Sequence, residues 1–197
     1  MYSLKVLSTL ASVLLPLIAR AATPNPPGLT YLFTANASLA QSIDMGVGPY
    51  GERVAIPIIG GTFSGPRVNG TILNLGADWG WTDTHDPNEP GRTTFHPDTR
   101  YQLRTADGAN IFVQTEGPAQ ADGTIHLREK FETGSPAYYW LNNVVAVGVL
   151  RSGDGYVVID TWQVSADLDP STLFPSCFLG AEQTMVQDVH QEQYQRV

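Results

Sequence analysis

Short β-rich runs separated by tight-turn signals are the feature that most constrains the fold of this chain. Three Asp-Gly pairs, at 107–108, 122–123 and 154–155, stand between such runs, and this dipeptide favours the tight turns of β-hairpins. Helical periodicity is scarce, whereas glycine and proline are frequent, with 19 and 14 residues. The pattern is typical of an all-β sandwich or barrel. About nine strands are predicted, over residues 29–39, 53–59, 67–75, 77–82, 99–105, 110–116, 124–133, 138–150 and 156–164.

The two ends of the chain differ from this middle region. Lys5 precedes an apolar run over residues 6–18, and Ala19-Arg20-Ala21 has the small-x-small pattern of a signal-peptidase site. We therefore predict a cleaved signal peptide over residues 1–21, in preference to a membrane anchor or a buried helix. The folded domain is expected over residues 29–180, followed by a polar, glutamine-rich tail over 181–197.

Two acceptor triplets for N-glycosylation fit this secretory route. They begin at Asn36 and Asn69, and both predict side chains that are exposed to solvent. The protein is expected to be secreted or to lie in the lumen of the secretory pathway, with no membrane attachment after the signal peptide is removed.

Charge and cysteine content exclude several other classes. The chain has 19 acidic and 11 basic side chains, which argues against nucleic acid or an anionic membrane surface as a partner. The single cysteine, Cys177, excludes an internal disulfide, and its apolar neighbours favour a buried, inert thiol over a nucleophile. The sequence does not define the oligomeric state.

Motifs for the commonest catalytic machineries are also missing. There is no Gly-x-Ser-x-Gly elbow, and the glycine-rich stretch 60–65 lacks the lysine and the following helix of a phosphate loop. A sharp bend between strands is its expected role. The four histidines show no pair at metal-ligand spacing, so we predict neither a metal site nor a cofactor.

Aromatic and polar side chains are unusually concentrated on the predicted strands. Tyr101, Leu103 and Thr105 share one face of a strand, and Arg100, Gln102 and Arg104 share the other. In a closed barrel one face of each strand points inward, where every polar atom needs a partner. Either these groups satisfy one another, or they surround a ligand cavity, and we favour the cavity.

One predicted connection is long, over residues 83–98. It is polar and contains three prolines, which suits either a binding loop that folds over the barrel or a solvated excursion. His96 lies on it. If the loop covers the mouth of the barrel, His96 is a further candidate for a general base, although an exposed loop histidine is the commoner case.

A resemblance to a known family rests on an ordered series of short motifs. The series comprises Gly60-Gly61-Thr62-Phe63-Ser64-Gly65-Pro66, Gly70, Gly76-Ala77-Asp78-Trp79, Arg100-Tyr101, Leu103, Thr105, Asp107-Gly108, Ile111, Phe131-Glu132-Thr133, Tyr138 and Trp140-Leu141-Asn142. In this order the chain resembles the DUF3237, or UPF0311, family of small proteins of uncharacterised function, over about residues 30–163. The resemblance implies a single antiparallel β-barrel of the lipocalin or calycin type, and it carries no established activity.

The functional prediction is a cofactor-independent isomerase or cyclase that acts on a hydrophobic secondary metabolite, polyketide-like or terpenoid-like, held inside the barrel. Asp78 or Glu116 would accept a proton, and Tyr101 is grouped with them as catalytic. Arg100 or Arg104 would stabilise negative charge that develops on oxygen. The residues predicted to bind substrate are Trp79, Thr105, Tyr138, Trp140 and Asn142.

Two other functions remain open at this point. A non-catalytic carrier of a hydrophobic small molecule needs the same cavity without acid–base groups inside it, and a purely structural protein would have a filled barrel. Each candidate residue also has a simpler explanation. Asp78 can cap a strand end, the arginines can be exposed or paired with Asp107, and Asn142 can hydrogen-bond the backbone.

Overall fold

The computed structural model of the protein describes residues 24–165. The predicted signal peptide, Cys177, the polar tail and the last part of the predicted domain, residues 166–180, lie outside the described residues. Every barrel strand falls within residues 28–165.

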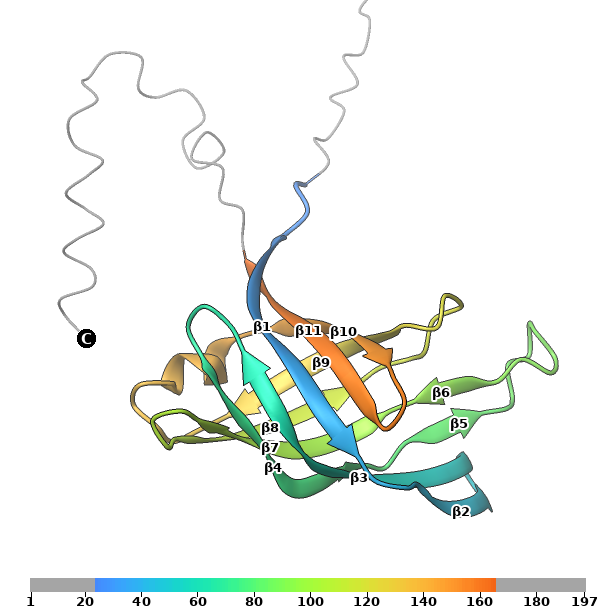
Figure 1. The fold of residues 1–197 in the computed structure, drawn as a ribbon. Coiled ribbons are helices and arrows are strands. Elements are labelled where there is room, and N and C mark those ends of the chain that lie inside the picture. Colours follow the sequence, from blue (N-terminus) through green and yellow to red (C-terminus); the bar gives the residue numbers. More distant parts are fainter. Residues whose placement is uncertain (1–23, 166–197) are drawn as a thin grey trace, which may run out of the picture.

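Eight antiparallel strands form a closed barrel (Figure 1). They are β1 (Gly28–Leu39), β3 (Gly51–Ser64), β4 (Asn69–Asp78), β7 (Asp98–Thr105), β8 (Asn110–Glu116), β9 (Ile125–Glu132), β10 (Ala146–Ser152) and β11 (Tyr156–Ser165). Each pairs with the next one named, and β11 returns to pair with β1. This up-and-down order, which lipocalins share, leaves no free edge. The predicted single antiparallel all-β barrel is confirmed.

Turn chemistry explains three of the connections between these strands. Gly108, Gly123 and Gly155 all have positive φ, at 92°, 83° and 75°, which a glycine adopts at low cost. They belong to the three Asp-Gly pairs, and they lie between β7 and β8, β8 and β9, and β10 and β11. The three predicted turns are confirmed.

Three short strands extend the sheet outside the closed barrel: β2 (Ile43–Gly48), β5 (Trp81–Asp83) and β6 (Thr94–His96). Strand β2 pairs with the first part of β3, and β5 pairs with both β3 and β6. We call the β5–β6 hairpin, residues 81–96, the arm. The sheet therefore has 11 strands instead of about nine. Strand β2 was not predicted, although Ile43, Met45 and Val47 alternate with Asp44, Gly46 and Gly48. These three apolar side chains are exposed and lie outside the core of the described residues.

The predicted break at Gly76 is wrong, since β4 continues through it to Asp78. The rest of the predicted strand 77–82 is divided, because Trp81 and Thr82 belong to β5. Gly76 permits the continuity of β4. A Cβ at this position would lie 2.6 Å from the carbonyl oxygen of Arg100, so only glycine lets β4 approach β7 so closely. The glycine-rich stretch 60–65 was expected to bend the chain between strands, but Gly60–Ser64 lies within β3.

The predicted strand 138–150 is wrong in its first half. Residues Tyr139–Asn143 form a 3-10 helix, η1, and β10 begins only at Ala146. Asn142 fixes this turn by accepting a hydrogen bond from the Thr133 amide at 2.8 Å and donating one to the Thr133 carbonyl at 2.9 Å. The alternation of faces predicted for residues 138–142 therefore does not apply.

The barrel is packed solid at the end that η1 covers. Phe33 makes edge-to-face contacts with Phe63 and Phe131 at ring-centroid distances of 5.7 and 5.9 Å, and Leu141 of η1 is buried beside this group of core residues. We call this the closed end. Any cavity must therefore lie toward the opposite end, where β1, β4 and β10 finish.

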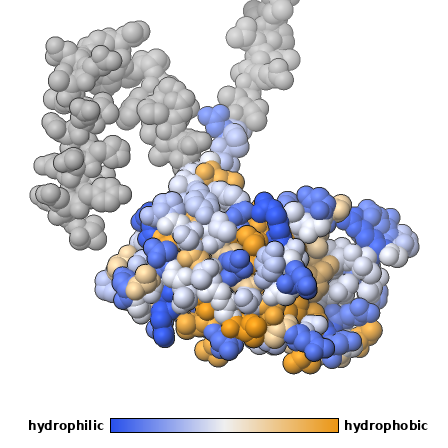
Figure 2. Space-filling model, in the orientation of Figure 1, coloured by the Kyte–Doolittle hydropathy of each residue, from blue (hydrophilic) through white to orange (hydrophobic). Residues whose placement is uncertain are grey.

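The outer surface is mixed in character (Figure 2). Apolar colour gathers where Figure 1 places β3 and β4, and exposed large apolar side chains there include Ile59 and Leu75. None of the helices in the described part of the chain is long and apolar enough to span a lipid bilayer.

Candidate functional site

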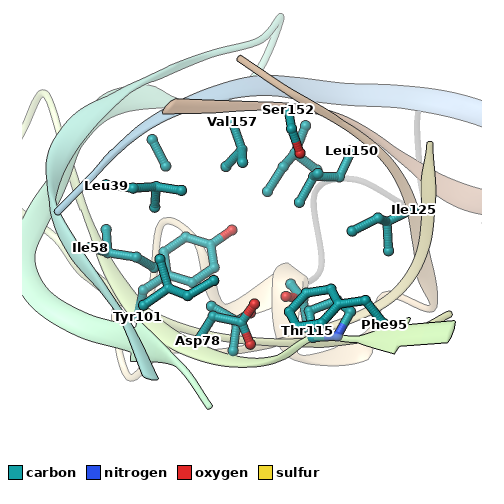
Figure 3. Close-up of a pocket in the computed structure, with 15 residues that line it drawn as sticks. Leu39, Ile58, Asp78, Phe95, Tyr101, Thr115, Ile125, Leu150, Ser152 and Val157 are labelled. Atoms are coloured by element: carbon teal, nitrogen blue, oxygen red, sulfur yellow. The ribbon is translucent and has the colours of Figure 1, made fainter. Parts of the chain in front are cut away.

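A cavity of about 120 Å³ lies inside the barrel at the end opposite η1. Its wall is built from strand ends: Leu39 finishes β1, Ser152 finishes β10 and Asp78 finishes β4. Figure 3 shows aliphatic side chains facing the Asp78 carboxyl group and the Tyr101 hydroxyl group across this space. The remaining lining residues are Ala37, Ile56, Ile58, Phe95, Pro97, Thr99, Thr115, Ile125, Leu150, Val157 and Ile159.

One row of polar side chains crosses four neighbouring strands on the inner face. Asp78 of β4 pairs with Thr99 of β7, Thr99 pairs with Thr115 of β8, and Thr115 pairs with Glu129 of β9. Adjacent strands lie about 4.8 Å apart, so the row spans roughly 14 Å of the wall. We call Asp78, Thr99, Thr115 and Glu129 the polar row. Its first three members line the cavity.

Asp78 has the properties of a general acid–base group. Its Oδ1 atom accepts a hydrogen bond from the Asp98 amide at 2.8 Å. Burial raises the pKa of its carboxyl group from 3.8 to about 6, against the opposing effect of hydrogen bonds from the Asp98 amide and the Thr99 hydroxyl. A group with a pKa in this range can both take and return a proton near neutral pH.

Tyr101 projects from β7 into the same space. Its side chain is 2 % exposed, and its hydroxyl oxygen has no hydrogen-bond partner. Burial, with a further contribution from Glu129, raises the pKa of the phenol well above its ordinary value. The hydroxyl group therefore keeps its proton and is available as a donor.

Glu129 is a buried carboxyl group that the sequence analysis did not select. Its Oε1 atom accepts a hydrogen bond from the Thr161 hydroxyl at 3.2 Å, while Oε2 has no partner. Burial raises the pKa of this carboxyl group to about 8, so it is largely protonated at neutral pH. The sequence did hold a signal. Strand β9 alternates buried and exposed positions, and Glu129 occupies a buried one between Leu127 and Phe131.

Three predicted catalytic residues lie on the outer face of the barrel instead. Arg100 forms an ion pair with Asp98 at 2.7 Å, and Arg104 donates a hydrogen bond to Asn110 at 3.1 Å. Glu116 lies 3.7 Å from Arg128 and is exposed. The inner face of β7 carries Thr99, Tyr101, Leu103 and Thr105, so its arginines necessarily point outward. The structure does not bring these three side chains to the cavity.

Four predicted substrate-binding residues lie at or near the closed end. Thr105 and Tyr138 both donate hydrogen bonds to Asp107, Tyr138 at 3.1 Å. The Arg67 guanidinium lies 3.7 Å from the centre of the Trp140 ring, and Asn142 bonds the backbone of Thr133. None of the four lines the cavity. Each makes contacts that hold the covering turns in place.

The arm brings part of the predicted long connection to the site. Phe95 and Pro97 line the cavity, whereas His96 points away and stacks on Trp81 at a centroid distance of 4.3 Å. Trp79, which follows β4, is 40 % exposed and does not line the cavity. Within residues 24–165, no cluster of three or more side chains has the composition of a metal site.

Gly148 of β10 makes room for the Glu129 carboxyl group. We expect Gly148→Ala to lower the free energy of unfolding by about 1–3 kcal/mol, because an added Cβ would lie 2.1 Å from Glu129 Oε1. Urea unfolding would measure this loss. Gly134→Ala is the matched control, since nothing lies within 4 Å of a Cβ there. The double variant with Glu129→Ala should recover part of the loss, and strict additivity would contradict this packing.

The comparisons with known proteins cover most of the barrel. Residues 27–164 match the profile of a family described as a protein of unknown function (DUF3237). The hydroalkoxylation enzyme phnH of Penicillium herquei is 30 % identical over 141 residues, 72 % of this chain and 86 % of that protein. A UPF0311 protein of Rhodopseudomonas palustris is 31 % identical over 151 residues, 68 % of this chain and 94 % of its own length.

A solved structure shows the same architecture. The crystal structure of a beta-barrel like protein from Acinetobacter baumannii superimposes with a TM-score of 0.64 at 33 % identity, covering 73 % of this chain and 99 % of that one. Fold, motif order and sequence identity therefore agree, and the chain belongs to the DUF3237 family, whose members include the UPF0311 proteins.

Proposed function

We propose that this protein is a cofactor-independent cyclase or isomerase that binds a hydrophobic secondary metabolite inside the barrel. The observation that carries the proposal is Asp78, a carboxyl group with a pKa raised to about 6 on the wall of an otherwise mostly aliphatic cavity. A relative in the same family is named a hydroalkoxylation enzyme, which supports a ring-closing reaction.

Intramolecular hydroalkoxylation fits the groups that are present. A substrate hydroxyl group adds across a carbon–carbon double bond, so that one O–H bond and one π bond break while one C–O and one C–H bond form. The product is an isomer of the substrate, and no oxidant or reductant is consumed. Asp78 takes the hydroxyl proton as the C–O bond forms, and the same carboxyl group then returns it to carbon. The cycle therefore needs no second substrate.

The cavity wall contributes by ordering the substrate. Holding two reacting groups of one molecule in contact can replace about 7–11 kcal/mol of the barrier in well-oriented cases. The volume of about 120 Å³ is slightly below the roughly 150 Å³ of a cavity that holds benzene. We therefore place only the reacting part of the substrate inside it. The remainder would extend past Phe95 and Pro97 at the base of the arm.

A non-catalytic carrier is the second candidate, and the aliphatic character of most of the wall favours it. One experiment separates the two functions. The purified protein is incubated with extracts of a strain that lacks its gene, followed by chromatography and mass spectrometry. An enzyme moves one metabolite to a new retention time at unchanged mass. A carrier retains a metabolite without changing it, and no effect on any metabolite contradicts both proposals.

We also propose that the protein passes through the secretory pathway, and the acceptor sites test this. Asn36 on β1 and Asn69 at the start of β4 are both exposed, so each can carry a glycan without disturbing the core. Protein secreted from a eukaryotic host should therefore lose mass in two steps on deglycosylation. Asn36→Gln and Asn69→Gln should each remove one step. A secreted wild-type protein of unmodified mass would contradict the assignment.

A further inference from the structure

Two polar atoms inside the barrel lack any hydrogen-bond partner, namely the Tyr101 hydroxyl oxygen and Glu129 Oε2. Leaving a buried polar group unsatisfied costs about 1–3 kcal/mol, so a folded protein rarely keeps two such groups without a use for them. In the described part of the chain the remaining buried unpartnered side-chain atom belongs to Gln102, which lies on the outer side of β7.

Both groups belong to the region around the cavity. Tyr101 lines it directly, and Glu129 stands next to the lining residue Thr115 in the polar row. The Glu129 carboxyl group also reaches the space above Gly148, beside Ile159, which is a lining residue as well. After burial, the charge of Glu129 is the second cause that raises the pKa of the Tyr101 phenol. Tyr101 lines the cavity, and Glu129 lies beside lining residues without lining the cavity itself. We call these two groups the polar floor.

We propose that the Tyr101 hydroxyl group and the Glu129 carboxyl group together donate hydrogen bonds to one oxygen atom of the ligand. The proposal deepens the proposed function, on which it rests. It assigns a substrate class, an oxygenated ring compound whose reacting double bond is conjugated to a ketone oxygen. Both groups are neutral donors at neutral pH, because burial raises the pKa of each. A pair of neutral donors suits an oxygen that gains negative charge during reaction.

The chemical step then divides between the two sides of the cavity. Asp78 removes the proton from the attacking hydroxyl group, the new C–O bond forms at the far carbon of the double bond, and the π electrons move onto the conjugated oxygen. The polar floor stabilises that oxygen without giving up its own protons. When the electrons return, the near carbon takes the proton from Asp78. All protons and electrons are accounted for within one substrate molecule.

Simple phenols test the polar floor without the natural substrate. The probes are phenol, 4-cyanophenol and 4-nitrophenol, each compared with the ring that carries methyl in place of hydroxyl: toluene, 4-methylbenzonitrile and 4-nitrotoluene. Binding is measured by calorimetry on the whole protein. We expect each phenol to bind at least about tenfold more tightly than its methyl partner, the equivalent of one hydrogen bond. The advantage should grow with the acidity of the phenol.

Variants assign this preference to the two residues. Tyr101→Phe and Glu129→Met, which both lack the donor, should each reduce phenol affinity by about tenfold and leave the affinity for the methyl-bearing rings unchanged. Tyr139→Phe and Glu132→Met are the controls, since both side chains are exposed. Equal binding of the two ring series, no phenol binding at all, or a phenol preference that survives in both variants would each overturn the proposal.

Failure of this inference can be told apart from failure of the proposed function. If the protein prefers phenols but converts no metabolite, the polar floor is supported and the protein is a carrier. If the protein converts a metabolite but does not prefer phenols, the cyclase proposal stands and the proposed role of Tyr101 and Glu129 is wrong. A crystal structure with 4-nitrophenol adds a direct reading, because a water molecule alone between Tyr101 and Glu129 would make the two groups a hydration site and refute the assignment.

Discussion

Replacing Asp78 with asparagine is expected to lower turnover by about 10²–10⁴-fold while ligand affinity changes by less than about tenfold. Asparagine keeps the size of the side chain, and its amide oxygen can still accept the hydrogen bond that the Asp98 amide donates at 2.8 Å. What it cannot do is take a proton. The measurement is the rate at which the metabolite found in the extract experiment changes retention time, alongside calorimetric binding of the same compound.

The pH dependence of the conversion rate tests the role of Asp78 as a base independently. The pKa of Asp78 is raised to about 6, so the wild-type rate should fall as the pH drops below that value and the base becomes protonated. The residual rate of Asp78→Asn should lack this inflection. Asp44→Asn is the matched control, because Asp44 is exposed on β2 and does not line the cavity. Full activity of Asp78→Asn would contradict the proposal that Asp78 transfers the proton in the reaction.

The sequence predicted the architecture well because its signals are local. Each Asp-Gly pair specifies a turn that only a few backbone conformations satisfy, and each β-rich run alternates between an inner and an outer face. Asp78 and Tyr101 were among the predicted catalytic residues, and both line the cavity. Their roles stay predictions until the variants are measured.

What the sequence could not supply was the relation between distant strands. Arg100 and Tyr101 are neighbours in the chain, and only closure of the barrel decides which of them points inward. The run 138–150 shows why periodicity fails over short apolar segments, since η1 and β10 read as one strand. Tyr138, Trp140 and Asn142 carry the family resemblance, and the contacts they make hold the closed end.

The position of Glu129 likewise became clear only in the folded barrel, and its burial makes stability depend on pH. Its pKa is raised from 4.5 in the unfolded chain to about 8 in the barrel, so the folded state binds more protons than the unfolded state between these values. Stability must therefore fall as the pH rises through this window, by about 1.4 kcal/mol per pH unit at most. Asp78 contributes a similar slope only from 3.8 to about 6, so the range from about pH 6 to 8 isolates Glu129.

Glu129→Gln is accordingly expected to raise the free energy of unfolding by about 1–3 kcal/mol near pH 7.5 and to flatten the slope between about pH 6 and 8. Glutamine keeps the shape and can still accept the bond from Thr161, but it has no proton to lose. Urea unfolding at a series of pH values measures both effects. Glu132→Gln, exposed on the same strand, should leave the slope unchanged.

A gain in stability in Glu129→Gln, together with a loss of phenol affinity in Glu129→Met, would show that the buried carboxyl group is kept for binding, since selection for stability alone would have replaced it. If Glu129→Gln instead loses stability at every pH, the carboxyl group serves the packing of β9 against β10 and β11, and the polar floor has a structural origin. The sign of the change in unfolding free energy caused by Glu129→Gln therefore decides whether the Glu129 carboxyl group serves ligand binding or the packing of the barrel.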